Sequence, residues 1–160
     1  MVFFEPVMIY SRSSQYAIRA LTFLTAHSNG ALCRLETIAG SEQIPQHFLA
    51  KILQRLVKKR LVKSSKGIKG GFALNLPAEK TTLFMIVDAI DDLSLALGDC
   101  ILGRSNCSEE THCPLHESWK QLLENQVHLL QSITLADMAS ADQRRLHNSK
   151  EVSSLGGLER

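Results

Sequence analysis

The sequence contains no apolar run long enough to span a membrane. Its short apolar start has no basic residue ahead of it and is interrupted by Glu5 and Pro6, so it does not match a signal peptide. We therefore expect a cytoplasmic protein without a membrane partner. The 160 residues, 44% of them hydrophobic, suffice for one small domain, with or without an appended helix.

Acidic residues are absent between Gln43 and Ala78, although the net charge of the chain is only +2. From Glu79 to Asp142 the balance reverses, with many carboxylates and few basic residues. This asymmetry indicates that the first half binds a polyanion, with nucleic acid as the leading candidate. A solvated basic helix face is the alternative, but it explains the complete exclusion of acids less well. The basic residues of the acid-free stretch are Lys51, Arg55, Lys58, Lys59, Arg60, Lys63, Lys66 and Lys69.

Cysteine is scarce, and three of the four cysteines fall within residues 100–116, a polar segment that we expect to be a loop. In a cytosolic protein, clustered cysteines bind metals or serve redox chemistry more often than they form disulfides. Three thiols and one imidazole on a single loop can converge on a metal, and zinc is compatible with that set. The fourth cysteine, Cys33, is expected to be a small buried residue. The candidate ligands are Cys100, Cys107, Cys113 and His116, with His112 as an alternative histidine.

Helical spacing of apolar residues runs from Ser13 to His27, and a short second helix is expected from Leu35 to about Gly40. Ile44-Pro45 then opens a third helix, since proline is acceptable in a first helical turn. The apolar residues of this third helix, expected to form one buried stripe, are Phe48, Leu49, Ile52, Leu53, Leu56 and Val57. A short helix, a tight turn and a helix with a basic outer face are typical of a helix-turn-helix. Taken alone, however, this pattern favours an ordinary three-helix bundle with a basic surface.

The residues that follow favour a DNA-binding domain. Residues 61–65 and 72–76 read as two strands on either side of a glycine-rich basic turn, and this arrangement predicts the wing of a winged helix. Glycines let such a turn approach a phosphate backbone or a minor groove, and lysines supply the charge. The start of the third helix would lie nearest the bases in the major groove. The candidate DNA contacts are Gln46, His47, Lys51, Arg55, Lys66 and Lys69.

After the wing, Thr81 or Thr82 can cap a fourth helix. Asp91, Asp92 and Asp99 follow it without calcium-loop spacing, so we expect them to be solvated. The longest helix is expected after the cysteines, with apolar residues at a and d spacing. So broad an apolar face in a small protein predicts an isologous homodimer, with packing on the first helix as the alternative. The residues of this face are Trp119, Leu122, Gln126, Leu129 and Ile133.

These features divide the chain into five parts and predict a mostly α fold with a small β-hairpin wing. The parts are a winged helix-turn-helix (8–78), a connecting helix (79–99), a cysteine-rich loop (100–116), a dimerisation helix (114–139) and a disordered polar tail (140–160).

This combination resembles the IscR/NsrR-like winged-helix iron–sulfur regulators, the Rrf-two family, from about Met8 to about Ala139. The motifs that carry the resemblance are Tyr16-Ala17, Ile38-Ala39, Ile44-Pro45 through Leu49, Leu61-Val62, Lys66-Gly67, Gly70-Gly71-Phe72, the three cysteines and the tryptophan-bearing helix. The resemblance implies a dimeric transcription regulator that binds double-stranded DNA at a palindromic operator. It also implies that the regulator senses iron–sulfur status, iron, nitric oxide or redox state.

The resemblance further implies an iron–sulfur cluster, with 2Fe–2S favoured over 4Fe–4S because an imidazole completes the site in one branch of the family. The implied ligands are Cys100, Cys107, Cys113 and His116. In other branches the fourth ligand is a carboxylate from the partner's first helix, where this chain has Gln15. One branch also uses an acid in the recognition helix whose interactions depend on the state of the cluster, and this chain has Ala50 there. The implied switch is therefore simpler. The cluster folds the loop against the dimer helix and sets the spacing of the two recognition helices.

Other functions stay open from the sequence. A zinc-binding or cluster-free winged-helix regulator is the main alternative, and repressor and activator are both compatible with it. A thiol or Fe–S oxidoreductase is the least favoured, because the chain lacks a Cys-X-X-Cys pair, a nucleotide-binding fingerprint and a phosphate loop. We therefore expect no enzyme and no catalytic residue.

Overall fold

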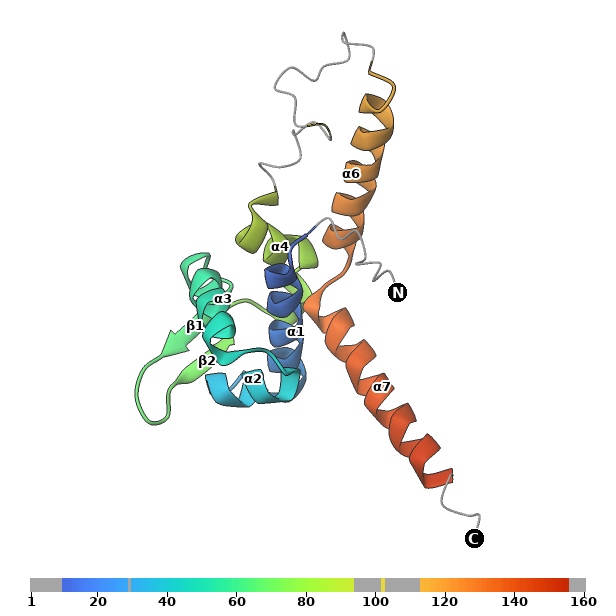
Figure 1. Cartoon of the computed structure of the whole chain (residues 1–160). Coiled ribbons are helices and arrows are strands. Elements are labelled where there is room, and N and C mark those ends of the chain that lie inside the picture. The colour runs from blue at the N-terminus through green and yellow to red at the C-terminus, as the bar shows by residue number, and fades with distance from the viewer. Residues whose placement is uncertain (1–9, 29, 94–101, 103–112, 156–160) are drawn as a thin grey trace, which may run out of the picture.

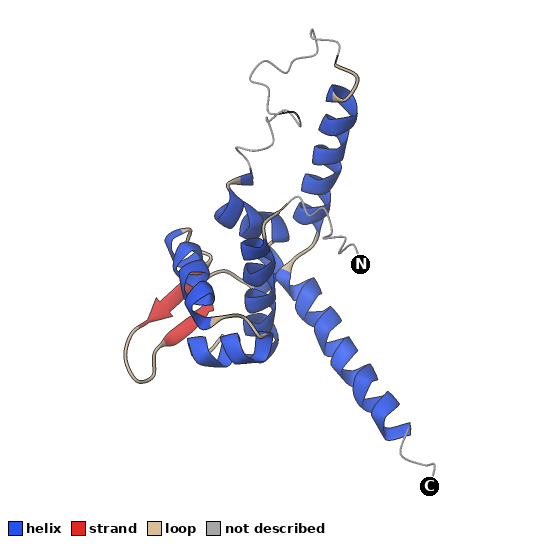
Figure 2. Ribbon diagram, in the orientation of Figure 1, coloured by secondary structure: helices blue, strands red, loops and turns tan. Residues whose placement is uncertain are grey.

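The computed structural model describes residues 10–28, 30–93, 102 and 113–155, with side chains described as far as Arg145. The described chain is mostly helical and carries one two-stranded antiparallel hairpin (Figures 1 and 2). The predicted fold class is therefore confirmed. None of the helices in these ranges combines the length and apolarity needed to cross a bilayer.

The helices of the first half are α1 (Arg12–His27), α2 (Leu35–Glu42) and α3 (Gln46–Lys58). Helix α1 begins at Ser11, whose hydroxyl accepts a hydrogen bond from the N–H of Ser14 at 3.2 Å. The helix therefore begins slightly earlier than Ser13, where the helical spacing in the sequence placed its start. Helix α2 ends at Gln43, whose left-handed backbone (φ 51°) turns the chain into α3.

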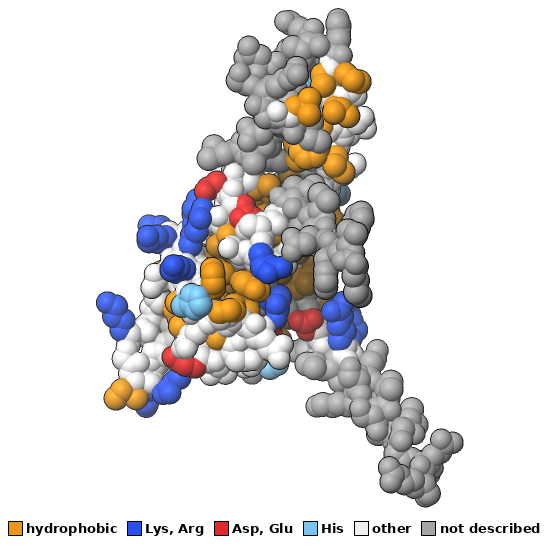
Figure 3. Space-filling model, viewed as in Figure 1, with side chains coloured by type: hydrophobic (Ala, Val, Ile, Leu, Met, Phe, Trp, Pro, Cys, Tyr) orange, Lys and Arg blue, Asp and Glu red, His pale blue; other side chains and the backbone are white. Residues whose placement is uncertain are grey.

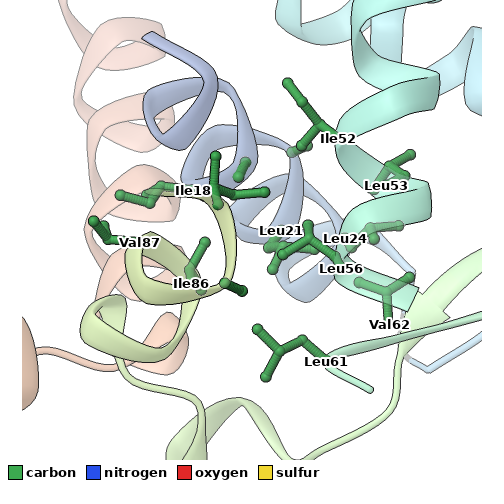
Figure 4. Close-up of a cluster of buried hydrophobic side chains, with 14 of the residues drawn as sticks. Ile18, Leu21, Leu24, Ile52, Leu53, Leu56, Leu61, Val62, Ile86 and Val87 are labelled. Carbon is green, nitrogen blue, oxygen red and sulfur yellow. The ribbon is translucent and has the colours of Figure 1, made fainter. Parts of the chain in front are cut away.

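The core lies where α1, α3 and α4 (Leu83–Asp91) meet. Figure 4 shows the side chains that fill it, among them Ile18, Leu21, Leu24, Ile52, Leu53, Leu56, Leu61, Val62, Ile86 and Val87. The predicted stripe of α3 is narrower than expected, because Phe48 is 50% exposed and Val57 is only partly buried. At about 100° per residue, both lie roughly 90° from the midline of the buried leucines, at the two edges of the stripe.

The hairpin pairs β1 (Val62–Ser65) with β2 (Gly71–Leu74), from Val62 opposite Leu74 to Ser65 opposite Gly71. The other edge of β2 pairs with Cys33, whose N–H donates to the Phe72 carbonyl at 2.9 Å and whose carbonyl accepts from the Phe72 N–H at 2.8 Å. The wing is therefore tied to the residues just before α2. Cys33 itself is partly buried, and burial raises the pKa of its thiol.

The second half contains η1 (Ala78–Lys80), α4, α6 (His116–Ser132) and α7 (Leu135–Leu155). Thr82 caps α4 by accepting from the N–H of Met85 at 3.4 Å, as the sequence predicted. Figure 1 shows α6 and the end of α7 leaving the domain in different directions. Helix α6 packs on α4, whereas α7 packs on α1 and η1.

The dimerisation helix expected over 114–139 is thus two helices. The helix is interrupted at Ile133 and Thr134, because the backbone there is extended and pairs with residues 81–83. The Leu83 N–H donates to the Ile133 carbonyl, and the Leu135 N–H donates to the Thr81 carbonyl, both at 2.9 Å. The helical spacing of apolar residues could not predict these hydrogen bonds, because their partners are distant in the sequence.

Thr134 starts the new helix through a reciprocal cap with Asp137. The Asp137 N–H donates to the Thr134 hydroxyl at 3.2 Å, and the Thr134 N–H donates to the Asp137 carboxylate at 2.9 Å. The Thr134 hydroxyl also donates to the Asp137 carboxylate at 2.7 Å. This hydrogen bond and the one from the Thr134 N–H lower the pKa of Asp137. The expected disordered tail also differs from the structure, which continues α7 to Leu155. Residues 135–155 contain neither glycine nor proline, so nothing in them ends a helix.

Replacing Gly71 with alanine should loosen the wing. A Cβ there would lie 2.4 Å from the Cys33 carbonyl oxygen, so β2 could not keep its place beside Cys33. We expect Gly71→Ala to lower the free energy of unfolding by roughly 1–3 kcal/mol, measured by urea denaturation. Gly40→Ala is the matched control, since a Cβ in α2 meets nothing within 4 Å. It should raise stability by about 0.4–1 kcal/mol, and equal effects of the two variants would contradict the packing described.

Candidate nucleic-acid interface

The outer face of α3 is polar and basic. Opposite its buried stripe lie His47, Lys51, Gln54 and Lys58, all exposed. The imidazole of His47 lies beside the half-exposed ring of Phe48, with the ring centroids 4.6 Å apart and the planes tilted by 43°. The structure therefore brings His47 and Lys51, two of the predicted base readers, to one face, and it adds Phe48 beside them.

Gln46 and Arg55, which were also predicted to contact DNA, lie at the two edges of this face. The Gln46 amide donates to the Glu36 carboxylate of α2 at 3.0 Å. Arg55 turns the other way, toward α4, where its Nε donates to the Ala89 carbonyl at 3.0 Å and its Nη2 lies 2.7 Å from Asp92 Oδ2. Both side chains therefore already have partners inside the protein. Sequence reasoning missed these partners because they come from other helices.

Asp91 and Asp92, which were expected to be solvated, remain partly exposed but also bind partners within the protein. Asp91 accepts from the N–H and hydroxyl of Ser11 at 2.7 and 2.6 Å and from the hydroxyl of Ser14 at 2.8 Å. Asp92 meets Arg55 and, at 3.4 Å, the ammonium of Lys59. The end of α4 therefore holds both the start of α1 and the last turns of α3. The third acid of this group, Asp99, lies outside the described residues.

The wing presents two exposed lysines, Lys66 and Lys69, on either side of its turn. Gly67 has a φ of 100°, a conformation that glycine adopts without strain. Between the lysines, Ile68 is 89% exposed, and its carbonyl accepts a hydrogen bond from Arg34 Nη2 at 2.8 Å. Figure 3 shows Lys and Arg side chains gathered along the edge of the molecule that carries α3 and the hairpin.

The structure describes two of the four predicted metal ligands. Cys113 and His116 are half-buried and lie within one turn, because the His116 N–H that opens α6 donates to the Cys113 carbonyl at 3.1 Å. Cys100 and Cys107 lie outside the described residues. Among the described ranges alone, no three His, Cys, Asp or Glu side chains gather to hold a metal. Thiols with an imidazole nonetheless form a donor set that suits an iron–sulfur cluster or zinc.

Helix α6 has two apolar sides. Leu123 and Leu130 are buried, on the helix that packs against α4. On another side, Leu115, Leu122 and Leu129 repeat every seven residues and are 45, 47 and 56% exposed. The other members of the predicted stripe, which are Trp119, Gln126 and Ile133, are half-buried. The exposed leucines are not covered by α1, which was the alternative packing.

Known proteins are similar to this chain in sequence and in fold. Residues 10–141 match the Rrf2 family, described as iron-dependent transcriptional regulators. An HTH-type transcriptional regulator of Aquifex aeolicus is 32% identical over 141 residues, which cover 87% of this chain and 96% of that protein. The regulator IscR of Pectobacterium carotovorum is 28% identical over 155 residues, covering 89% of this chain and 93% of that protein.

Two solved structures share the fold at 22% sequence identity and a TM-score of 0.66. One is IscR of T. potens, which covers 85% of this chain and 89% of its own. The other is CymR, the global cysteine regulator of B. subtilis, with 84% and 98% covered. These relatives and neighbours are regulators and not enzymes. Because the family match spans the domain, the wing and α6, the chain belongs to the Rrf2 family of winged-helix transcriptional regulators.

Proposed function

We propose that this protein is a homodimeric regulator that binds operator DNA through α3 and the wing, under the control of an iron–sulfur cluster. The observation that carries the DNA-binding part is the set of exposed lysines on α3 and the hairpin, along one edge of the molecule (Figure 3). Within the described part of the chain, Lys51, Lys66 and Lys69 have no salt-bridge partner, so their charges are available to phosphates.

The two parts of this surface would have different tasks. The start of α3, with His47 and Lys51, would enter the major groove, where lysine can contact guanine. The wing lysines would contact phosphates or the minor groove and thereby fix the register of the protein on the duplex. A two-fold dimer requires two half-sites, so the operator would be palindromic.

Dimerisation is proposed through the exposed side of α6. Its three exposed leucines follow a heptad, with Trp119 and Gln126 alongside, as expected of a helix that pairs with a second copy of itself. Leu123 and Leu130 are already used inside the chain. The same helix can therefore pack on α4 and on a partner at once.

The cluster is proposed at the start of α6. Cys113 and His116 would bind it together with Cys100 and Cys107, and the family's description as iron-dependent supports iron over zinc. When bound, the cluster supplies a group that iron supply, oxidants or nitric oxide can alter. The segment that carries the thiols joins α4 to α6, so metal binding there shares free energy with the folding of that connection. Zinc at the same residues, or no metal, is the alternative.

The wing contact predicts a salt-dependent loss in Lys66→Ala. We expect weaker binding to all duplexes, and a slope of log K against log salt that is shallower by about 1, because one phosphate contact is lost. The matched control is Lys80→Ala, which removes the same charge from η1. Fluorescence anisotropy over a salt series measures both slopes. Equal slopes in the two variants would rule out the wing contact.

The cluster is tested on protein purified without oxygen. We expect visible absorption, an electron paramagnetic resonance signal after reduction, and iron with sulfide by elemental analysis. Cys107→Ala should lose these signals, whereas Cys33→Ala, at the partly buried cysteine beside β2, should keep them. A colourless zinc protein would contradict the cluster, and a full cluster in Cys107→Ala would contradict the ligand assignment.

The dimer is tested by placing a charge on the exposed stripe of α6. Leu122→Glu should give a folded monomer, because dimerisation would have to bury the new carboxylate at the interface and remove its water. Sedimentation equilibrium gives the mass, and Trp119, the single tryptophan, should shift its emission to the red. Gln121→Glu, at an exposed neighbour, should remain dimeric. An unchanged mass in Leu122→Glu would place the interface elsewhere.

A further inference from the structure

Arg55 is held at two atoms by the end of α4. Its Nε donates to the Ala89 carbonyl at 3.0 Å, and its Nη2 lies 2.7 Å from Asp92 Oδ2. The second oxygen of the same carboxylate lies 3.4 Å from Lys59 Nζ. One carboxylate thus pairs with two neighbouring cations at the end of α3, one on each of its oxygens.

The position of these cations on α3 sets them apart from the DNA-facing residues. Counted at about 100° per residue, Arg55 lies roughly 60° round the helix from the midline of His47, Lys51 and Lys58, and Lys59 lies farther still. Long side chains at such an edge can swing toward a phosphate backbone when they are free. Asp92 directs them toward α4.

The backbone of Asp92 suits this task. The residue ends α4 in the left-handed conformation, with φ and ψ both 49°, and its N–H donates to the Asp88 carbonyl at 3.0 Å. Aspartate and asparagine both tolerate that conformation. The preceding residue, Asp91, accepts hydrogen bonds from Ser11 and Ser14 at the start of α1. Asp92→Asn therefore removes the charge while leaving the turn and the contacts of Asp91 in place.

We propose that Asp92 is a positioning residue for DNA recognition. It turns Arg55 and Lys59 into a clamp between α3 and α4, and it withholds both cations from the phosphates of non-operator DNA. Arg55 is then an anchor of α3 and not a DNA contact. The inference rests on the proposed role of α3 as the recognition helix, and it is independent of any metal.

The exposure of the pair supports a role in specificity over one in stability. The Arg55 and Asp92 side chains are 46 and 45% exposed, so solvent screens their attraction and little of the folding free energy depends on it. Sequence-independent affinity, in contrast, grows with each cation that reaches a phosphate. Loss of Asp92 should therefore strengthen sequence-independent DNA binding while leaving the melting temperature close to that of the wild type.

The test uses two labelled duplexes, one selected by the wild-type protein from a randomised library and one of the same composition in shuffled order. Asp92→Asn should bind the shuffled duplex roughly threefold to tenfold more tightly and with a steeper salt slope. Arg55→Gln should leave the salt slope unchanged, whereas Lys51→Ala should reduce it by about 1. In the double variant with Arg55→Gln, the gain from Asp92→Asn should shrink.

Glu42→Gln is the matched control, because it removes the charge partner of Arg19, at 3.1 Å, between α1 and α2. It should leave both affinities unchanged. The proposal is overturned if Arg55→Gln lowers the slope as much as Lys51→Ala does, or if Asp92→Asn binds the shuffled duplex no more tightly than Glu42→Gln. If Lys51→Ala binds DNA as the wild type does, the proposed role of α3 as the recognition helix is contradicted, and so is the proposed role of Asp92.

Discussion

The end of α4 is the point on which the arrangement of this molecule depends. Asp91 holds the start of α1 through two serines, and Asp92 holds the last turns of α3 through Arg55 and Lys59. Helix α6 packs on the same short helix. The proposed DNA-reading and dimer-forming elements thus meet at α4. In the sequence, the cysteine-bearing segment lies between α4 and α6. A change in that segment would therefore act where the two proposed functions meet, which suits a proposed dimer that must match a fixed half-site spacing.

Local patterns predicted the parts of the fold that depend on neighbouring residues. The period of α3, the cap at Thr82 and the alternating strands around the glycine-rich turn all identified elements that the structure contains. Phe48 was placed in the core because a helical period does not fix the width of the buried stripe, which the neighbouring helices decide. The break at Ile133 was missed for a similar reason, although the cap formed by Thr134 and Asp137 was a local signal for it.

The candidate site was predictable in composition but not in detail. The excess of lysines predicted a polyanion-binding surface, and the cysteine spacing predicted a cofactor segment, of which only Cys113 and His116 lie among the described residues. Which cations face outward was not predictable, because the partners of Gln46 and Arg55 come from residues 10 and 37 positions away. Consecutive carboxylates such as Asp91 and Asp92 look solvated in a sequence. Only the packing of α1, α3 and α4 around them reveals two separate contacts.

The central claim is that the state of the cysteine segment changes how tightly the dimer binds DNA. The most direct measurement titrates one selected duplex with wild-type protein purified without oxygen, then with the same preparation after a chelator has removed its metal, and again after reconstitution. We expect removal to weaken binding roughly 5–150-fold, the usual range of coupling between two sites, and reconstitution to restore it. Equal affinities in all three states would show that the metal does not control DNA binding in this protein.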